Sequence, residues 1–566
     1  MRHPDCVFPY GMSSPFSLPI NHLLHMSHRL LTTDRYIFMT GSTGLLGSYL
    51  VRDLLLSGRR LALLVRRDRK HSPRSRVEKF LSHWEDLLGI RLPRPVVLEG
   101  NLSEPLCGLD EASCNWIRRN CDQVLNNAAS LTFRASDRDA DPWLTNVTGT
   151  TNVLELAGKT GLKHLHHVST AYTCGLRSGR ILESELDVGQ EFGNDYEKSK
   201  VESEGLVRSA DHLQTVTIYR PSIIVGDSQT GYTSTYHGFF AALRLGHTLL
   251  TRVVKGSTNS PALMGLLGVD LQAQKNFVPV DWVASVIVDV MQTPTAHGKT
   301  FHLTHPAPLS MNTVGCLVQE AVNCFSQDAS PDDPDLCDEQ WFADNLRTQL
   351  DVYTSYYRND PTFDQTNTLQ FASHIPCPTL DTPTMLRMAR LAIENDFGRQ
   401  AAPKQKPVFD VETFFGPSLS LDPDGDALSL SDSTNSVDQP SRLGLEIAGA
   451  GGGQWTLYGC NDQLLAVVPG IDARAGSVYR LNTHTFQKLI ARSIDMDAAF
   501  NAGSILVDTT PDNHSASPTR GTRILQEKLK ALLHAAVLKN NTQANPAAWP
   551  PSEEAVMAGT IDGPAD

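Results

Sequence analysis

Near its start the chain carries a short apolar strand pattern that runs directly into a glycine-rich turn. The strand pattern covers Tyr36–Thr40, the glycines Gly41, Gly44 and Gly47 follow at regular intervals, and an apolar helical pattern continues to Leu56. Glycines let the backbone turn sharply and approach a pyrophosphate, and the N–H groups of a helix N-terminus favour its negative charge. A turn without a ligand is the alternative, but the flanking strand and helix are the context that the motif requires. The sequence therefore predicts a dinucleotide-binding site.

Strand and helix patterns alternate after this turn. We expect further strands at Leu61–Val65, Pro95–Glu99, Gln123–Asn126, His164–Ser169, Thr215–Tyr219 and Asn276–Pro279. We expect helices at Arg76–Leu88, Pro142–Ala157, Tyr196–Arg208 and Trp282–Met291. Strands that alternate with helices of this length form βαβ units, whose parallel strands build a sheet with helices on both faces. The sequence therefore predicts an α/β fold with a Rossmann-type doubly wound parallel sheet.

At 566 residues the chain is too long for a single core, so we expect two or three domains. The segment after Phe301 is mixed and contains an acidic loop at Ser330–Asp335, and residues 416–441 have the Ser, Asp, Pro and Gly composition of a linker. We expect a flexible N-terminal extension at 1–34, a Rossmann domain at 35–310, a smaller substrate lobe at 311–415, the linker at 416–441, an α+β domain at 442–540 and a disordered tail at 541–566.

The charge and hydropathy patterns exclude some classes of function. The net charge of -13 at pH 7 argues against a nucleic-acid partner. No uncharged apolar run reaches the roughly 18 residues of a membrane span. The shorter apolar stretches at Phe239–Leu250 and Leu263–Leu267 are more typical of an amphipathic substrate lid or of a patch that contacts membranes peripherally.

The ten cysteines and the N-terminal segment indicate a cytoplasmic protein. The cysteines form no C-x-x-C pair, and Cys107, Cys114 and Cys121 have no histidine at ligand spacing, so we expect buried thiols in a reducing cytosol and no metal site. The first 33 residues lack the basic, apolar and cleavage segments of a secretory signal in their usual order.

Two arginines, Arg66 and Arg67, follow the second expected strand, about twenty residues after the glycines. An acidic residue at this position accepts the ribose hydroxyls of NAD, whereas an arginine suits the 2′-phosphate of NADP. The planar guanidinium group matches phosphate geometry well. We therefore expect NADPH as the cofactor, and the nearby Asp68 leaves NADH as the alternative.

A tyrosine and a lysine, Tyr196 and Lys200, lie four residues apart in an expected helix and therefore share one face of it. The ammonium group favours a phenolate, so we expect a lowered pKa for Tyr196. Tyr196 is therefore a candidate proton donor: it would protonate a carbonyl oxygen while a hydride adds to the carbonyl carbon. Ser169 and Thr170 end the fifth strand, where a hydroxyl faces the ligand crevice and would hold a substrate carbonyl. Ordinary hydrogen bonding at the strand end is the alternative for these two residues.

Together these elements resemble the extended short-chain dehydrogenase/reductase superfamily. Within it they are most similar to the fatty acyl-CoA reductase and thioester reductase branch, also called the male-sterility type. The matching segments occur in the family's order over about residues 35 to 310. They are Thr40–Gly47, Leu63–Arg66, Asn127–Ser130, Asn146–Thr150, His167–Tyr172, Tyr196–Lys200, Tyr219–Gly226 and Val278–Asp281.

The resemblance implies a set of site residues. It implies that Thr170, Tyr196 and Lys200 form a catalytic triad and that Lys200 also contacts the nicotinamide ribose. The implied cofactor-binding residues are Gly41, Thr43, Gly44, Leu45, Leu46 and Gly47 at the pyrophosphate, Arg66 and Arg67 at the 2′-phosphate, Asn101 and Leu102 near the adenine, Ala128 and Ala129 in the cleft, and Pro221, Ser222 and Ile223 beside the nicotinamide. The family usually has Gly-Asp where this chain has Gly100-Asn101, and an asparagine can also hydrogen-bond adenine.

The resemblance also implies an activity, the NADPH-dependent reduction of a long-chain fatty acyl thioester. The acyl group would arrive on coenzyme A or on an acyl carrier protein, and Tyr196 with Thr170 would stabilise the oxyanion. The hemithioacetal would then release a thiol and the aldehyde, and a second hydride transfer would give the alcohol. One alternative is another reaction of the superfamily, on a hydroxysteroid or a nucleotide sugar. A second is a noncatalytic lipid carrier that senses NADPH.

Residues 443–539 resemble a sterol-carrier-protein-type lipid-binding domain. The elements that carry this resemblance are expected strands at Gln454–Gly459, Leu464–Val468 and Ser477–Leu481, a helix through Phe486–Ala491, an Ala-Phe-x-x-Gly turn at Ala499–Gly503 and a last helix at Arg523–Leu538. The resemblance implies an apolar pocket that holds a lipid acyl chain for the reductase. The alternative is a small α+β domain that serves a homodimer or the stability of the chain.

Overall fold

The computed structural model describes residues 35–88, 91–248, 269–325, 358–399, 411–415, 441–448, 452–460, 463–472, 474–491, 493–501 and 505–509. The chain divides into two compact units, residues 1–89 with 95–403 and residues 90–94 with 404–566, and each is described by itself. Several expectations lie outside the described residues: the extension at 1–34, the linker at 416–440, the tail at 541–566, the acidic loop Ser330–Asp335, the apolar stretch Leu263–Leu267 and the helix Arg523–Leu538.

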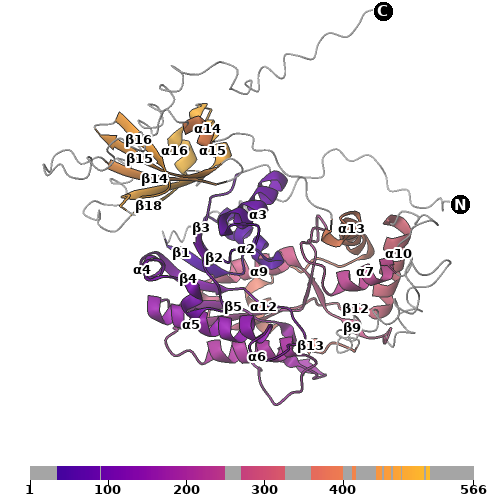
Figure 1. The fold of residues 1–566 in the computed structure, drawn as a ribbon. Helices are drawn as coiled ribbons and strands as arrows, with labels where there is room; N and C mark the ends of the chain where they lie inside the picture. The colour runs from indigo at the N-terminus through magenta and orange to yellow at the C-terminus, as the bar shows by residue number, and fades with distance from the viewer. Residues whose placement is uncertain are drawn as a thin grey trace, which may run out of the picture. The chain divides into compact units, whose positions relative to one another are not determined.

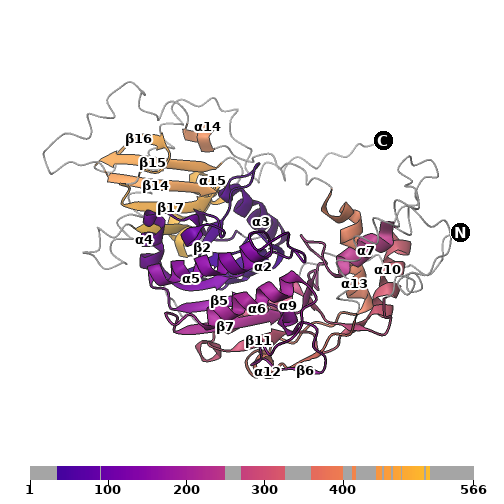
Figure 2. The same cartoon turned by 60° about the horizontal axis from the view of Figure 1, so that its bottom comes forward.

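A sheet of seven parallel strands forms the centre of the first unit (Figures 1 and 2). Its strands, in the spatial order β11-β7-β5-β4-β1-β2-β3, are β11 (Thr300–Leu303), β7 (Thr215–Pro221), β5 (His164–Val168), β4 (Cys121–Asn126), β1 (Tyr36–Thr40), β2 (Arg60–Val65) and β3 (Val96–Glu99). The order reverses between β1 and β4, where Thr40 lies opposite Asn126. Ligands bind outside the carboxyl ends of the strands at such a point. The predicted fold class is confirmed.

Helices cover both faces of this sheet (Figures 1 and 2). One group consists of α2 (Leu45–Leu56), α3 (Pro73–Leu88) and α9 (Val280–Met291), and the other of α4 (Glu111–Asn120), α5 (Gly149–Thr160) and α6 (Asp195–Arg208). Successive strand side chains point to opposite faces, so alternate residues of each strand pack under each group. Phe38, Ala62 and Val124 pack with Val153 and Leu156 of α5 in one of the two resulting cores.

Two regions differ from the sequence expectation. The strand expected at Asn276–Pro279 forms as β9 (Gln274–Lys275) and β10 (Phe277–Pro279), which pair outside the main sheet. The seventh strand of the main sheet is β11 instead, and its four buried residues include a threonine and a histidine, so they give little apolar signal. The helix expected from Pro142 begins with a π-helical turn, η2 (Leu144–Thr148), before α5.

A smaller lobe extends beyond the carboxyl ends of the strands. It contains α7 (Phe239–Thr248), α10 (Met311–Phe325) and α13 (Thr382–Glu394), which lie side by side in both views (Figures 1 and 2). A Cβ on Gly246 would lie 2.3 Å from Val318, so α7 and α10 can approach closely only with glycine at this position. The remaining short elements of the unit are β6 (Arg180–Ile181), β8 (Ile223–Val225), β12 (Leu309–Ser310), β13 (Thr362–Phe363), α12 (Thr366–Ala372), η1 (Pro105–Gly108), η3 (Ala171–Cys174), η5 (Pro294–Ala296) and η7 (Asp396–Gly398).

The second unit contains a five-stranded mixed sheet in the order β16-β15-β14-β17-β18. Its elements are α14 (Val411–Phe415), β14 (Ser441–Ala448), β15 (Gly453–Cys460), β16 (Gln463–Pro469), β17 (Ser477–Asn482), α15 (Thr483–Ile490), α16 (Met496–Asn501) and β18 (Leu506–Thr509). Phe414 and Phe415 pack with Trp455 and Phe486 in its core. The sterol-carrier-type interpretation stays a prediction. Among the helices that the structure describes in either unit, none has the length and apolar character needed to cross a membrane.

Candidate active site

The turn between β1 and α2 requires glycine at two positions, because a Cβ at either one would clash with the backbone. Gly41 has a φ of 71°, and a Cβ on it would lie 2.6 Å from the backbone nitrogen of Ala128. A Cβ on Gly47 would lie 1.9 Å from the carbonyl oxygen of Gly41, so glycine is needed for α2 to close on the turn. Gly44 is the N-cap of α2, and no side chain caps this end of the helix. Residues 41–47 line a cavity, and the first-turn N–H groups of α2 suit the pyrophosphate of a dinucleotide there.

Hydrogen bonds tie the carboxyl ends of β1 and β4 together beside this turn. The hydroxyl of Thr40 donates to Asn126 Oδ1 at 2.7 Å and accepts from the N–H groups of Asn127 at 3.2 Å and Ala128 at 3.1 Å. This arrangement fixes the backbone of Ala128 and Ala129, both of which line the cavity. The two alanines therefore share this cavity with the glycine-rich turn.

The arginines near the end of β2 have different surroundings. Arg66 lines the cavity. Arg67 lies outside the cavity lining and donates two hydrogen bonds to the carboxylate of Glu99, at 2.8 and 2.9 Å. Arg76 of α3 was missed by the sequence analysis, yet it lines the cavity and donates to Thr43 Oγ1 at 3.0 Å and to the carbonyl oxygen of Arg66 at 2.5 Å. Nothing in the spacing of Arg76 signals this role, because the fold brings it to the turn from another helix.

The loop after β3 carries the residues expected near the adenine. Asn101 and Leu102 both line the cavity. Asn101 donates from Nδ2 to Glu104 at 3.0 Å, and its Oδ1 accepts from the N–H of Ser103 at 3.3 Å. The carbonyl oxygen of Leu102 accepts from Asn152 of α5 at 2.7 Å. These contacts hold the loop in place at the end of the cavity next to β2 and β3.

The three residues of the expected triad lie in the same cavity. Thr170 follows β5 and hydrogen-bonds through its hydroxyl to the phenol of Tyr196, which starts the first turn of α6. Lys200, one turn further along α6, donates from Nζ to the carbonyl oxygen of Val168 at 2.8 Å. Helix α6 begins here because Asn194 caps it, accepting at Oδ1 from the N–H of Glu197 at 2.9 Å.

Burial dominates the proton affinities of this triad. It raises the pKa of Tyr196 to about 12, although the hydrogen bond with Thr170 acts in the opposite direction. Burial lowers the pKa of Lys200 to about 8, and the charge of Glu204 opposes that change. The expected lowering of the pKa of Tyr196 is therefore wrong for this structure, since burial raises this pKa. At neutral pH the phenol keeps its proton and the ammonium keeps its charge.

An asparagine of the π-helical turn, Asn146, connects two walls of the site. Its Oδ1 accepts from the N–H of Ser130 at 2.8 Å, and its Nδ2 donates to the carbonyl oxygen of Ser130 at 3.1 Å and to Ser199 Oγ at 2.9 Å. Asn146 thereby ties the loop after β4 to α6, the helix that carries Tyr196 and Lys200. Asn146 begins one of the motifs that carry the family resemblance, Asn146–Thr150, but its position in the sequence did not reveal this role.

The residues expected beside the nicotinamide lie where β7 ends and β8 begins. Pro221, Ser222 and Ile223 line the cavity. The carbonyl oxygen of Pro221 accepts from Thr170 at 3.4 Å, and Ser222 Oγ donates to Asn276 Oδ1 at 2.7 Å. Ile223 N–H donates to the carbonyl oxygen of Asn276 at 3.2 Å. Thr170 of the triad and Asn276, which precedes β10, thus both hold the end of β7 in place.

The cavity extends well beyond the glycine-rich turn and the triad. Its volume is about 990 Å³, and beyond the triad it continues between α7 and α10. Its apolar lining in this part consists of Phe239, Ala241, Ala242, Leu245, Gly246, Val269, Phe277, Met311, Val314 and Val318. We call this part the apolar chamber. An apolar space that is continuous with a polar reaction centre suits a substrate with a hydrophobic chain.

A buried ion pair lies at the wall between the triad and the apolar chamber. Asp360 accepts at Oδ2 from the phenol of Tyr172 and from the N–H of Asn276, both at 2.7 Å, and its other oxygen pairs with Lys275. Tyr172 and Lys275 line the cavity. The pair joins segments that are more than 80 residues apart in the sequence, so sequence patterns gave no signal of it.

The chain is similar to several known proteins. Residues 39–287 match the family model described as "Male sterility protein". The nonribosomal peptide synthetase asaC of Aspergillus flavus is 27% identical over 290 residues, 48% of this chain and 26% of that protein. The aldehyde reductase lnaA of the same species is 27% identical over 417 residues, 66% of this chain and 37% of that protein. The chain thus spans between about a quarter and two fifths of the length of these relatives.

A solved structure shows the same fold. The terminal R domain from the myxalamid PKS-NRPS biosynthetic pathway is 26% identical, with a TM-score of 0.50 over 66% of this chain and 94% of that domain. The first unit therefore has the fold of the extended short-chain dehydrogenase/reductase superfamily. Within this superfamily, residues 39–287 match the male sterility protein family, the branch that the sequence motifs predicted.

Proposed function

We propose that this chain is an NADPH-dependent reductase that converts a long-chain acyl thioester into an aldehyde. One observation carries the proposal: a single cavity holds the glycine-rich turn, the triad and the apolar chamber. The turn suits a dinucleotide, the triad suits carbonyl reduction, and the chamber suits an acyl chain. A reductase of small polar substrates would have little use for such a chamber.

Two arginines support NADPH over NADH. Arg66 and Arg76 line the cavity on the side of the glycine-rich turn, and Arg76 contacts Thr43 within that turn. Guanidinium groups bind phosphate through paired N–H donors, so these two side chains would hold the 2′-phosphate. Bound in this way, NADPH would supply the hydride that reduces the thioester carbonyl. The ion pair with Glu99 removes Arg67 from this role in our proposal.

The chain's own residues would handle the oxygen of the substrate. Tyr196 keeps its proton at neutral pH and would donate it to the carbonyl oxygen as negative charge develops there. Thr170 hydrogen-bonds to the same phenol and would orient it toward that oxygen. The positive charge of Lys200 would stabilise the phenolate that remains and would contact the nicotinamide ribose. The resulting hemithioacetal would break its C–S bond, its hydroxyl proton passing to the sulfur, to release thiol and aldehyde. A second hydride, from a further NADPH, would reduce the aldehyde to the alcohol.

The names of the similar proteins support a thioester substrate. Nonribosomal peptide synthetases and an aldehyde reductase are among them, and the R domain that shares the fold comes from a PKS-NRPS pathway. We propose a thioester on a carrier protein or on coenzyme A, with the acyl chain in the apolar chamber.

NADPH oxidation by the purified chain tests this function. We expect turnover with thioesters of coenzyme A or of pantetheine that carry acyl chains of increasing length, with the aldehyde as product. Tyr196→Phe should abolish turnover and leave NADPH binding intact, whereas Tyr232→Phe, whose side chain lies outside the cavity lining, should change little. Turnover of a hydroxysteroid or a nucleotide sugar, with none for any thioester, would contradict the proposal.

A further inference from the structure

A stripe of four polar side chains runs along one face of α6. Tyr196, Lys200, Glu204 and Arg208 follow each other at intervals of four residues, so they lie one above another on the helix. The first two line the cavity, and the other two continue the stripe away from it. Lys200 is 1% exposed and Glu204 is 0% exposed. A cation of the proposed site and an anion are therefore buried one helical turn apart.

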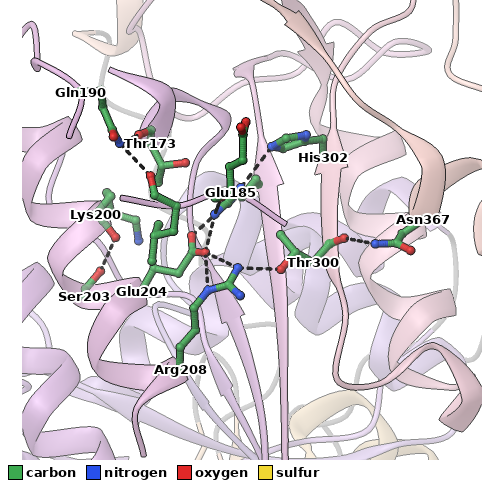
Figure 3. A network of polar contacts seen from close by, with 12 residues as sticks. Thr173, Glu185, Gln190, Lys200, Ser203, Glu204, Arg208, Thr300, His302 and Asn367 are labelled. Carbon is green, nitrogen blue, oxygen red and sulfur yellow. Dashed lines mark hydrogen bonds and ion pairs between the residues drawn. The ribbon is translucent and has the colours of Figure 1, made fainter. Parts of the chain in front are cut away.

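Two arginines hold the carboxylate of Glu204 in place. Arg220 of β7, which is also 0% exposed, donates from Nε to Oε2 at 3.0 Å and from Nη2 to Oε1 at 2.6 Å. Arg208 donates to Oε1 from Nε at 3.0 Å and from Nη2 at 2.7 Å, and Figure 3 shows this contact together with that of Arg208 to Thr300. Burial raises the pKa of Glu204, but the arginines outweigh it and hold the pKa at about 2.

Polar contacts with neighbouring strands and loops hold both arginines in place. Arg220 donates from Nη2 to the carbonyl oxygen of Glu185 at 2.7 Å and lies with Nη1 3.3 Å from His302 Nε2. Arg208 donates to Thr300 Oγ1 at 2.7 Å, and Thr300 and His302 both belong to β11 (Figure 3). The carboxylate of Glu204 therefore cannot turn away from α6 without breaking contacts to β7 and β11.

The buried histidines near Lys200 and Arg220 carry no charge in the neutral pH range. His167 of β5 faces Lys200, and burial lowers its pKa to about 3, so it stays neutral. Burial and Arg220 lower the pKa of His302 to about 4, so this histidine is neutral as well. The π-helical turn and α5 present Asn146 and Thr150, which do not titrate. Within the described part of the chain, Glu204 is the anion that acts on the ammonium of Lys200.

We propose that Glu204 is a positioning residue that keeps Lys200 charged for catalysis, and that Arg220 limits this effect by partly neutralising Glu204. A buried ammonium needs a compensating anion to remain ionised. An anion one turn away supplies it without pairing directly with Lys200, whose Nζ remains bonded to Val168 at the cavity. The inference rests on the proposed role of Lys200 in thioester reduction.

The proposal predicts opposite effects of two substitutions on the pH profile of kcat/KM. The alkaline limb of the profile reports the loss of the proton from Lys200. Glu204→Gln removes the anion, so this limb should move by about one pH unit to lower pH. Arg220→Met leaves Glu204 less neutralised, so the limb should move to higher pH. Glu202→Gln makes the same chemical change at an exposed position of α6 that pairs with Arg138, and it should leave the profile unchanged.

Two further variants separate the proposal from loss of folding and from failure of the proposed function. The double variant Glu204→Gln/Arg220→Met removes both buried charges. The fold tolerates this better than one buried charge left without its partner, and the alkaline limb should still move to lower pH. The pH dependence of NADPH binding, followed by fluorescence, should shift in the same directions even if no thioester is turned over. In a Lys200→Met background, Glu204→Gln should cause no further shift. Equal loss of activity at every pH, without a shift in either readout, would overturn the proposal.

Discussion

Arg76 offers a sharp test of how this site chooses its cofactor. Its guanidinium donates to Thr43 Oγ1 at 3.0 Å and to the carbonyl oxygen of Arg66 at 2.5 Å, and it lies 3.7 Å from Asp68. Arg76→Gln removes the positive charge but keeps a hydrogen-bond donor. If Arg76 binds the 2′-phosphate, the substitution should weaken the binding of NADPH and spare that of NADH, which lacks this phosphate.

The size of this effect follows from the type of contact and its exposure. A hydrogen bond between charged groups contributes about 1.5 to 3 kcal/mol, which corresponds to about ten- to hundredfold in affinity. The side chain of Arg76 is 27% exposed, so water and salt screen part of this energy. We therefore expect the Kd of NADPH to rise about tenfold at low ionic strength and the Kd of NADH to change less than about twofold.

Fluorescence titration of both cofactors measures these constants directly. Arg67→Gln is the matched control, because Arg67 is 62% exposed and pairs with Glu99 outside the cavity lining. It should change neither constant by more than about twofold. Equal weakening of NADPH and NADH by Arg76→Gln would refute the reasoning, and so would a larger loss of NADPH affinity in Arg67→Gln.

Three further predictions concern stability and the two ends of the cavity. Burial and the carboxylate of Asp227 raise the pKa of Asp281 to about 6, so its contribution to stability is present below about pH 4 and is lost as the pH rises through 6. Asp281→Asn should therefore gain stability relative to the parent chain as the pH rises from about 4 to about 7, by up to about 3 kcal/mol in calorimetric unfolding; a difference in stability that does not change with pH would contradict this. Gly47→Ala would place a Cβ 1.9 Å from the carbonyl oxygen of Gly41, so NADPH affinity should fall at least about tenfold in titrations. Ala242→Leu narrows the apolar chamber and should raise KM for long acyl chains but not for short ones, and an equal rise for both would argue against an acyl chain there.

Patterns of residues close together in the sequence predicted most of the fold and the main elements of the candidate site. The glycine-rich turn, and the face that Tyr196 and Lys200 share, depend on residues a few positions apart, which a sequence shows directly. Strand β11 was missed because its short run Thr300–Leu303 becomes a strand through pairing with β7 and has a weak apolar pattern of its own.

The features that the sequence did not reveal depend on contacts between distant segments. Arg76 reaches the turn from a different helix, 33 residues from its partner Thr43. Asp360 meets Tyr172 across 188 residues. The direction of the pKa change at Tyr196 also required the structure, because the degree of burial decides whether desolvation or a neighbouring charge prevails.

The most direct test of the account is the fate of the hydride. The purified chain would be mixed with a long-chain acyl thioester and with NADPH deuterated on one or the other face of nicotinamide C4, and the product would be analysed by mass spectrometry. The account predicts an aldehyde, or the alcohol derived from it, that carries deuterium from one of the two labelled faces, and no product with Tyr196→Phe. Binding of NADPH without transfer of label to any thioester would contradict the central claim.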